Sequence, residues 1–164
     1  MNHAVLYVRD VARSTAFYCD LLGFRVKMSV PGRASFLQAE GSTNDHDLGL
    51  FEIGAQAGPS AAGRATVGLY HLAWEVDTLE ELLRLRDVLA AAGALVGASD
   101  HGATKALYCH DPDGLEFEVS WLLPADLVTP DISMQTLPLD LEAEIARYGG
   151  RTKGGIGVSW PAPV

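Results

Sequence analysis

The feature that most constrains this chain is an internal repeat, because a repeated segment folds into copies of one unit. His3 begins the segment HAVLYV, and His71 begins HLAWEV 68 residues later. Gly23 and Gly93 end the helical patterns that follow, and they lie 70 residues apart. The letters FEI at 51–53 recur as FEV at 117–119, an offset of 66. Landmarks at a nearly constant spacing predict two copies of one structural unit.

Each copy has the pattern of a βαβββ unit, with apolar alternation in the strands and a helical period between the first two. In the first copy the strands are expected at 3–8, 24–30, 34–38 and 48–53, and the helix at 11–22. In the second, strands are expected at 70–76, 94–98, 105–110 and 115–121, and the helix at 79–93. We therefore predict an α+β fold of two tandem βαβββ modules with pseudo-twofold symmetry. The predicted organisation is a first module at 1–53, a linker at 54–66, a second module at 67–123 and a C-terminal extension at 124–164.

Strand alternation predicts which side chains share a face. In the first strand His3, Val5 and Tyr7 face one way, while Leu6 and Val8 face the helix. His71 and Ala73 take the first kind of position in the second module. In the closing strands Phe51, Ile53, Phe117 and Val119 are expected beneath the helices. The concave face is then expected to hold His46, Leu48, Leu50, Glu52, Glu116 and Glu118.

A histidine at the start of each module and a glutamate in the last strand form a possible metal-binding set. We predict His3, His71 and Glu118 as ligands in a cleft between the modules, a His/His/carboxylate set that leaves positions open for substrate and oxygen. The alternative makes them a surface histidine, a core histidine and a solvated charge. Their related positions on one face favour the metal site.

Composition excludes some classes of partner. The net charge of −9 does not provide the basic face that nucleic acids require, so a small-molecule substrate is expected. No stretch reaches the roughly 20 apolar residues that span a bilayer, and the N-terminus lacks the pattern of a signal peptide. The protein is expected to be cytoplasmic, without a membrane partner.

The chain resembles the vicinal oxygen chelate superfamily, which includes type I extradiol dioxygenases, glyoxalase I and bleomycin-resistance proteins. The resemblance rests on HAVLYVRDVARSTAFYCDLLGF, GLYHLAWEVD and LYCHDPDGLEFEVSW, and it covers about residues 1–123. NDHDLGLFE resembles the dioxygenase segment with an acid–base histidine, here His46. DHGATKALY resembles the segment that provides a pocket histidine and a tyrosine, here His101 and Tyr108. The alternative interpretation makes His46 a solvated loop residue, His101 a turn residue and Tyr108 a core residue.

The resemblance implies an extradiol-type dioxygenase that cleaves a catecholic aromatic with Fe(II) and O₂. Its first alternative is a glyoxalase I-like lyase or isomerase, in which Glu52 is a fourth ligand and the metal is Ni(II), Zn(II) or Co(II); Mn(II) is a further alternative to iron. The second alternative is a metal-free small-molecule (drug) binding protein, whose members generally lack the metal residues.

The C-terminal extension contains one helical pattern, LEAEIARY, with Leu141, Ile145 and Tyr148 at helical spacing. Such a helix covers an apolar flank or part of a subunit interface, or else the segment is a loosely attached tail. A homodimer is expected.

Overall fold

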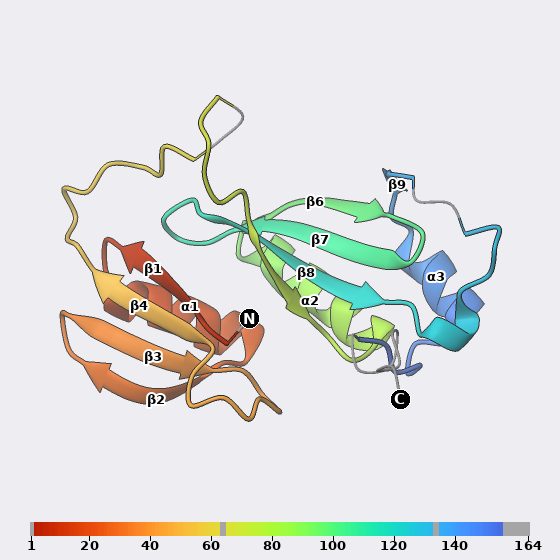
Figure 1. Ribbon diagram of the computed structural model, residues 1–164, viewed down its shortest axis with the longest axis horizontal. Helices are drawn as coiled ribbons and strands as arrows, with labels where there is room; N and C mark the ends of the chain where they lie inside the picture. Colours follow the sequence, from red (N-terminus) through yellow and green to blue (C-terminus); the bar gives the residue numbers. More distant parts are fainter. Residues whose placement is uncertain (1, 63–64, 133–134, 156–164) are drawn as a thin grey trace. The chain divides into compact units, whose positions relative to one another are not determined.

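The computed structural model describes residues 2–62, 65–132 and 135–155, and its contacts divide the chain into two compact units (Figure 1). The first unit comprises Met1–Gly68 with Asp111–Leu115, and the second comprises Leu69–His110 with Glu116–Val164. Each unit contains a βαβββ series, so the predicted α+β fold with tandem modules is confirmed. Among the described residues, no helix has the length and apolar character needed to cross a membrane.

The first unit is a four-stranded sheet covered by one helix. Its elements are β1 (Ala4–Val8), α1 (Val11–Leu22), β2 (Arg25–Val30), β3 (Ala34–Gln38) and β4 (Leu48–Glu52). The strand order is β1-β4-β3-β2, with β1 parallel to β4 and the other pairs antiparallel. The Asp10 side chain caps α1 by accepting from Arg13 N, and Gly23 ends it at φ 75°, a conformation that favours glycine.

The second unit repeats this arrangement and extends it. Its elements are β5 (Leu72–Glu75), α2 (Leu79–Ala91), β6 (Leu95–Asp100), β7 (Thr104–His110), β8 (Glu116–Leu122), the 3₁₀ helix η1 (Ala125–Leu127), β9 (Leu137–Pro138) and α3 (Leu141–Tyr148). The strand order is β5-β8-β7-β6-β9. The extension therefore contributes an edge strand to the sheet.

The C-terminal extension is packed against the second unit. Leu141 of α3 is buried, and Tyr148 lies with its ring centroid 6.0 Å from that of the buried Trp121. Lys105 of β7, whose side chain is 1% exposed, forms ion pairs with Asp100 at 2.6 Å and with Glu144 of α3 at 2.7 Å. Of the predicted alternatives, the structure shows α3 covering a flank of its own unit.

The predicted faces hold for β1, β5 and β8, but not for β4. Val5 and Tyr7 are exposed while Leu6 and Val8 are buried, and Phe117 and Val119 are buried in β8. The prediction for β4 is wrong, because Leu48 and Leu50 are fully buried while Phe51 and Ile53 are exposed. Glu52 pairs in register with the buried Val8, which places it on the helix side of the sheet.

The error in β4 comes from the alignment of the two modules. In the structure Val5 pairs with Gly49, and Ala73, its counterpart in the second module, pairs with Glu118. Gly49 therefore corresponds to Glu118, at an offset of 118 − 49 = 69, whereas matching the FE letters gave 66. A shift by an odd number of residues moves every side chain of a strand to the other face.

Candidate functional site

Four predicted site residues gather on one face of the sheet in the second unit. Tyr108 and Glu118 are direct partners in the β7–β8 pairing, and His71 immediately precedes β5, the strand paired with β8. His71 Nε2 lies 3.3 Å from Glu118 Oε2, and the His71 and Tyr108 ring centroids are 5.9 Å apart. The Tyr108 hydroxyl lies 2.8 Å from His101 Nε2. The structure therefore brings these four side chains into one cluster, which is partly shielded from solvent.

The His71 and Glu118 donor atoms have a separation that suits two ligands of one ion. Two bonds of about 2.1 Å at right angles place their donor atoms about 3.0 Å apart, close to the distance in the structure. The other ring nitrogen, Nδ1, is buried, and no described group lies within hydrogen-bonding distance of it. Glu116 Oε1 lies 3.9 Å from Nδ1, so a small movement gives the carboxylate partner that metal-binding histidines commonly have.

The electrostatics of this cluster keep Tyr108 protonated. Desolvation, followed by the negative charge of Glu118, raises the pKa of the Tyr108 hydroxyl above its ordinary value, and a hydrogen bond to Glu118 adds to the effect. The hydroxyl therefore remains a hydrogen-bond donor at neutral pH.

The first unit brings together the other two predicted histidines, His3 and His46. Their ring centroids are 4.5 Å apart, and His46 also lies edge-on to Phe36 at 5.1 Å. His46 lies in the loop before β4. Asn44 of this loop donates to the backbone oxygen of Asn2 at 2.9 Å, which ties the loop to the residues before β1.

Each of these two histidines has an oxygen partner for Nδ1. His3 Nδ1 lies 2.8 Å from the Asn2 side-chain oxygen, and His46 Nδ1 lies 3.0 Å from an Asp45 carboxylate oxygen. Because these oxygens only accept, the Nδ1 atoms must donate, which leaves each Nε2 free to bind a metal or accept a proton. The hydrogen bond from His46 is also the main reason that the pKa of Asp45 is lowered.

These partners were not identified from the sequence. Asn2 and Asp45 immediately precede His3 and His46, and a carboxylate or amide beside a histidine is the signal that could have found them.

Glu52, the predicted fourth ligand, has a different role in the first unit. Its Oε2 accepts a hydrogen bond of 3.0 Å from the backbone N of Val11, the first residue of α1. A carboxylate at a helix N-terminus stabilises the unpaired N–H groups there. This position on the helix side of the sheet does not fit a ligand that shares a face with His3. Gly49, at the position corresponding to Glu118, has no side chain to offer.

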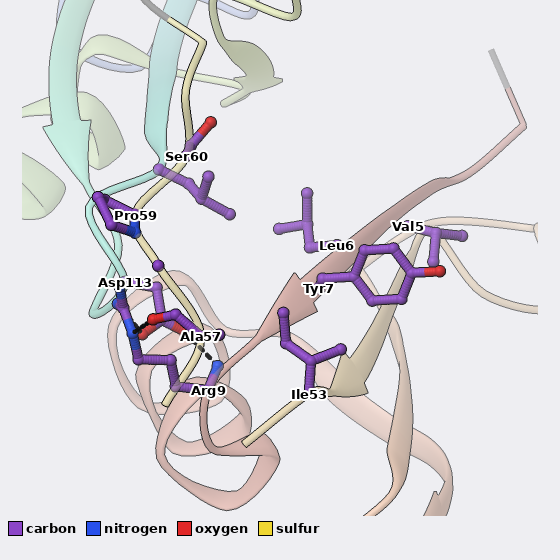
Figure 2. A pocket seen from close by; sticks show the side chains of 11 residues that line it. Val5, Leu6, Tyr7, Arg9, Ile53, Ala57, Pro59, Ser60 and Asp113 are labelled. Carbon is purple, nitrogen blue, oxygen red and sulfur yellow. Dashed lines mark hydrogen bonds and ion pairs between the residues drawn. The ribbon is translucent and has the colours of Figure 1, made fainter. Parts of the chain in front are cut away.

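The open face of the first sheet is apolar and hollowed in two places. A hollow of about 300 Å³ lies at the end of β1, where Figure 2 shows Arg9 and Asp113 together, Val5 and Tyr7 on the strand, and Ile53, which follows β4, beside them. A second hollow, of about 460 Å³, is lined by Ala34, Phe36 and Phe51 among others. Exposed aromatic and aliphatic side chains of this kind are suited to contact with an apolar ligand.

Three of the predicted metal ligands are not brought together within either unit, as far as the described residues show. Within the ranges that the structure describes, no group of three or more His, Cys, Asp or Glu side chains is close enough to hold an ion. His71 and Glu118 lie together in the second unit, and His3 lies beside His46 in the first.

Comparison with known proteins assigns the chain to a family. The profile of the Glyoxalase/Bleomycin resistance protein/Dioxygenase superfamily matches residues 1–119. The chain belongs to this superfamily. It is 31% identical over 160 residues to the Catechol-2,3-dioxygenase of Bacillus subtilis, covering 93% of this chain and 53% of that protein. It is also 26% identical over 120 residues to a Probable lactoylglutathione lyase of Synechocystis, covering 71% of this chain and 91% of that protein.

Solved structures agree with this assignment. A glyoxylase/bleomycin resistance protein/dioxygenase domain from Frankia matches with a TM-score of 0.60 and 25% identity, covering 73% of this chain and 89% of that one. The chain spans about half the length of the Bacillus dioxygenase. Superfamily membership therefore covers both βαβββ units, while relatives within it carry different activities in their names.

Proposed function

We propose that the chain is a metal-dependent enzyme of the extradiol dioxygenase type, which cleaves a catecholic aromatic with Fe(II) and O₂. The observation that carries this proposal is the convergence of His71, Glu118, Tyr108 and His101 on one face of the second sheet. The likeness to the Bacillus catechol dioxygenase along 93% of the chain supports the same reaction class.

In this proposal His71 and Glu118 are two of three protein ligands. The third, His3, belongs to the other unit, and its role stays a prediction from the repeat and from its free Nε2. Bound Fe(II) would supply the redox chemistry that couples a diol to O₂. Both atoms of O₂ enter the ring-opened semialdehyde, so the reaction balances without an external reductant.

His46 is the proposed acid–base group. Its Nδ1 donates to Asp45, so Nε2 is the atom that accepts a phenolic proton and later returns it. An imidazole nitrogen can both accept and donate a proton, which suits a group that must take up a proton and return it. Asp45 fixes the tautomer and the direction of the ring.

Tyr108 is the proposed substrate-orienting group. Its hydroxyl keeps its proton, so it can donate to a substrate oxygen, and His101 holds the hydroxyl from its other side. An aromatic substrate is supported by the apolar open face of the first sheet, where Val5 is 52% and Tyr7 is 71% exposed.

A glyoxalase-like lyase is the second candidate, and the likeness to the Synechocystis protein is the observation in its favour. That chemistry was expected to use Glu52 as a fourth ligand. The bond from Val11 to Glu52 and the glycine at position 49 favour the three-ligand site instead. A metal-free binding protein is disfavoured by the ligand-like spacing of His71 and Glu118.

The test is oxygen uptake by full-length protein reconstituted anaerobically with Fe(II) and given a panel of catechols. We expect uptake that requires Fe(II), a coloured ring-fission product, and loss of both in His71→Ala and Glu118→Ala. Glu52→Gln is the matched control, and it should retain turnover. Stoichiometric metal binding without uptake on any catechol would contradict the proposal, and hemithioacetal isomerisation with Ni(II) or Zn(II) would then be tested.

A further inference from the structure

The C-terminal extension brings a side chain to the cluster in the second unit. Thr136 lies beyond residues 1–119, the part of the chain that the superfamily profile matches. Its Oγ1 lies 3.2 Å from His101 Nδ1, while His101 Nε2 lies 2.8 Å from the Tyr108 hydroxyl. Both nitrogens of the His101 ring are therefore held, one by Tyr108 of β7 and the other by Thr136 of the extension.

The chain that follows Thr136 is anchored to the second unit. The next residues form β9, which pairs with β6 through Ser99 with Pro138 and Asp100 with Leu137. Asp100 also accepts from Lys105, and Lys105 is ion-paired with Glu144 of α3. Because His101 directly follows Asp100 in the chain, this pairing holds Thr136 beside the His101 ring.

The groups around Tyr108 determine which atom donates in each hydrogen bond of His101. Tyr108 has a single hydroxyl proton, and Glu118, its partner across the β7–β8 pairing, carries a carboxylate that can only accept a hydrogen bond. The Tyr108 oxygen must then accept from His101 Nε2–H. In a neutral imidazole the other nitrogen is an acceptor, so Nδ1 accepts from the Thr136 hydroxyl.

We propose that Thr136 is a positioning residue for His101. Its hydroxyl donates to Nδ1, holds the neutral ring in the Nε2–H tautomer, and so directs that N–H at the Tyr108 oxygen. The role in turnover rests on the proposed function, whereas the effect on the tautomer does not. The extension is thus a part of the site, although it lies outside the repeated modules.

The direct test is the tautomer of His101, measured by long-range ¹H–¹⁵N NMR on full-length protein kept free of paramagnetic metal. His101→Gln identifies the signals among those of the five histidines. In the wild-type protein we expect a pyridine-type Nδ1 and a pyrrole-type Nε2. Thr136→Val, which has the same shape without the hydroxyl, should shift both signals towards a mixture of tautomers, and Thr136→Ser should restore the wild-type pattern. A pyrrole-type Nδ1 in the wild type, or unchanged signals in Thr136→Val, would overturn the proposal.

The second readout is turnover of a catechol that the wild-type protein cleaves. A lost neutral hydrogen bond corresponds to a loss of roughly fivefold in kcat/KM for Thr136→Val, with Thr136→Ser within about twofold of wild type. Equal losses in both variants would contradict the role of the hydroxyl. If no catechol is cleaved by wild-type protein, the proposed function fails while the NMR experiment still decides the role of Thr136.

Discussion

His46 and Asp45 form the smallest unit whose geometry implies chemistry. The carboxylate accepts from Nδ1, and the ring contacts both His3 and Phe36, so its orientation is restricted on two sides. We predict that His46→Gln lowers kcat by about 10²- to 10⁴-fold, the usual contribution of an acid–base group. Asp45→Asn, which removes the charge but keeps an acceptor, should lower it by less than about tenfold. Iron content measured on the same samples should be unchanged; loss of iron in His46→Gln would instead identify it as a ligand.

Asp113 is the charged residue whose environment predicts a dependence of stability on pH. Burial opposes its ionisation, but hydrogen bonds from the Arg9 backbone and from the Arg9 and Arg13 side chains outweigh burial and hold its pKa below the usual value of 3.8. A lowered folded-state pKa stabilises the fold above that usual value, and the contribution is lost as pH falls through the folded-state pKa.

We therefore predict that Asp113→Asn lowers the free energy of unfolding by about 1.5–3 kcal/mol at neutral pH, the range for hydrogen bonds to charged groups. The difference from wild type should shrink as pH falls below the usual carboxyl range. Urea unfolding over a series of pH values measures it. A difference that stays constant down to acid pH would mean that the Asp113 charge does not contribute.

At the scale of elements, the helices and most strands follow from the sequence because their signals are local. Asp10 before α1, Thr78 before α2 and Asp140 before α3 each cap the helix that they precede, as helix-start residues do. The succession of strand, helix and three strands along each unit also follows from the repeat. The face of β4 does not, because LGLFE has leucines on one face and a phenylalanine on the other, so alternation cannot decide between them.

The site was predictable to the extent that its residues lie on strands with a clear pattern. Glu118 is set between the apolar Phe117 and Val119, so its face could be assigned from the sequence. Thr136 could not be found, because it lies 35 residues from His101 in the chain and their contact depends on β9 joining β6. Neither β9 nor this pairing has a local signal.

The attachment of α3 depends on Lys105, a buried cation with two carboxylate partners. Removing one member of a buried charged group leaves the others uncompensated, so we predict that Lys105→Ala lowers the free energy of unfolding by about 3–5 kcal/mol. Amide protons of 141–148 should then exchange faster relative to those of β8. Lys153→Ala is the matched control, because Lys153 is 75% exposed and 3.9 Å from Asp77, and its effect should stay within about 0.5 kcal/mol. Equal protection of α3 in both variants would show that Lys105 does not hold it.

For the whole molecule, metal binding and folding should be linked if the proposed ligands are correct. A ligand that binds only the folded chain at 100 times its Kd stabilises it by about 2.7 kcal/mol, which for a chain of this size raises Tm by roughly 5–10 °C. We predict this rise on adding Fe(II) anaerobically to wild-type protein. It should disappear in His71→Ala, Glu118→Ala and His3→Ala, because each removes one proposed ligand.

Glu52→Gln separates the three-ligand and four-ligand sites in the same experiment. Glu52 accepts from Val11 N at the start of α1, so the substitution should lower the Tm of metal-free protein while leaving the rise on adding metal intact. A Glu52→Gln protein that folds but shows no rise would make Glu52 a ligand after all, and would favour the lyase. A rise that survives His3→Ala while vanishing in His71→Ala would mean that the second unit binds the ion without the first, and the third ligand would have to be sought elsewhere.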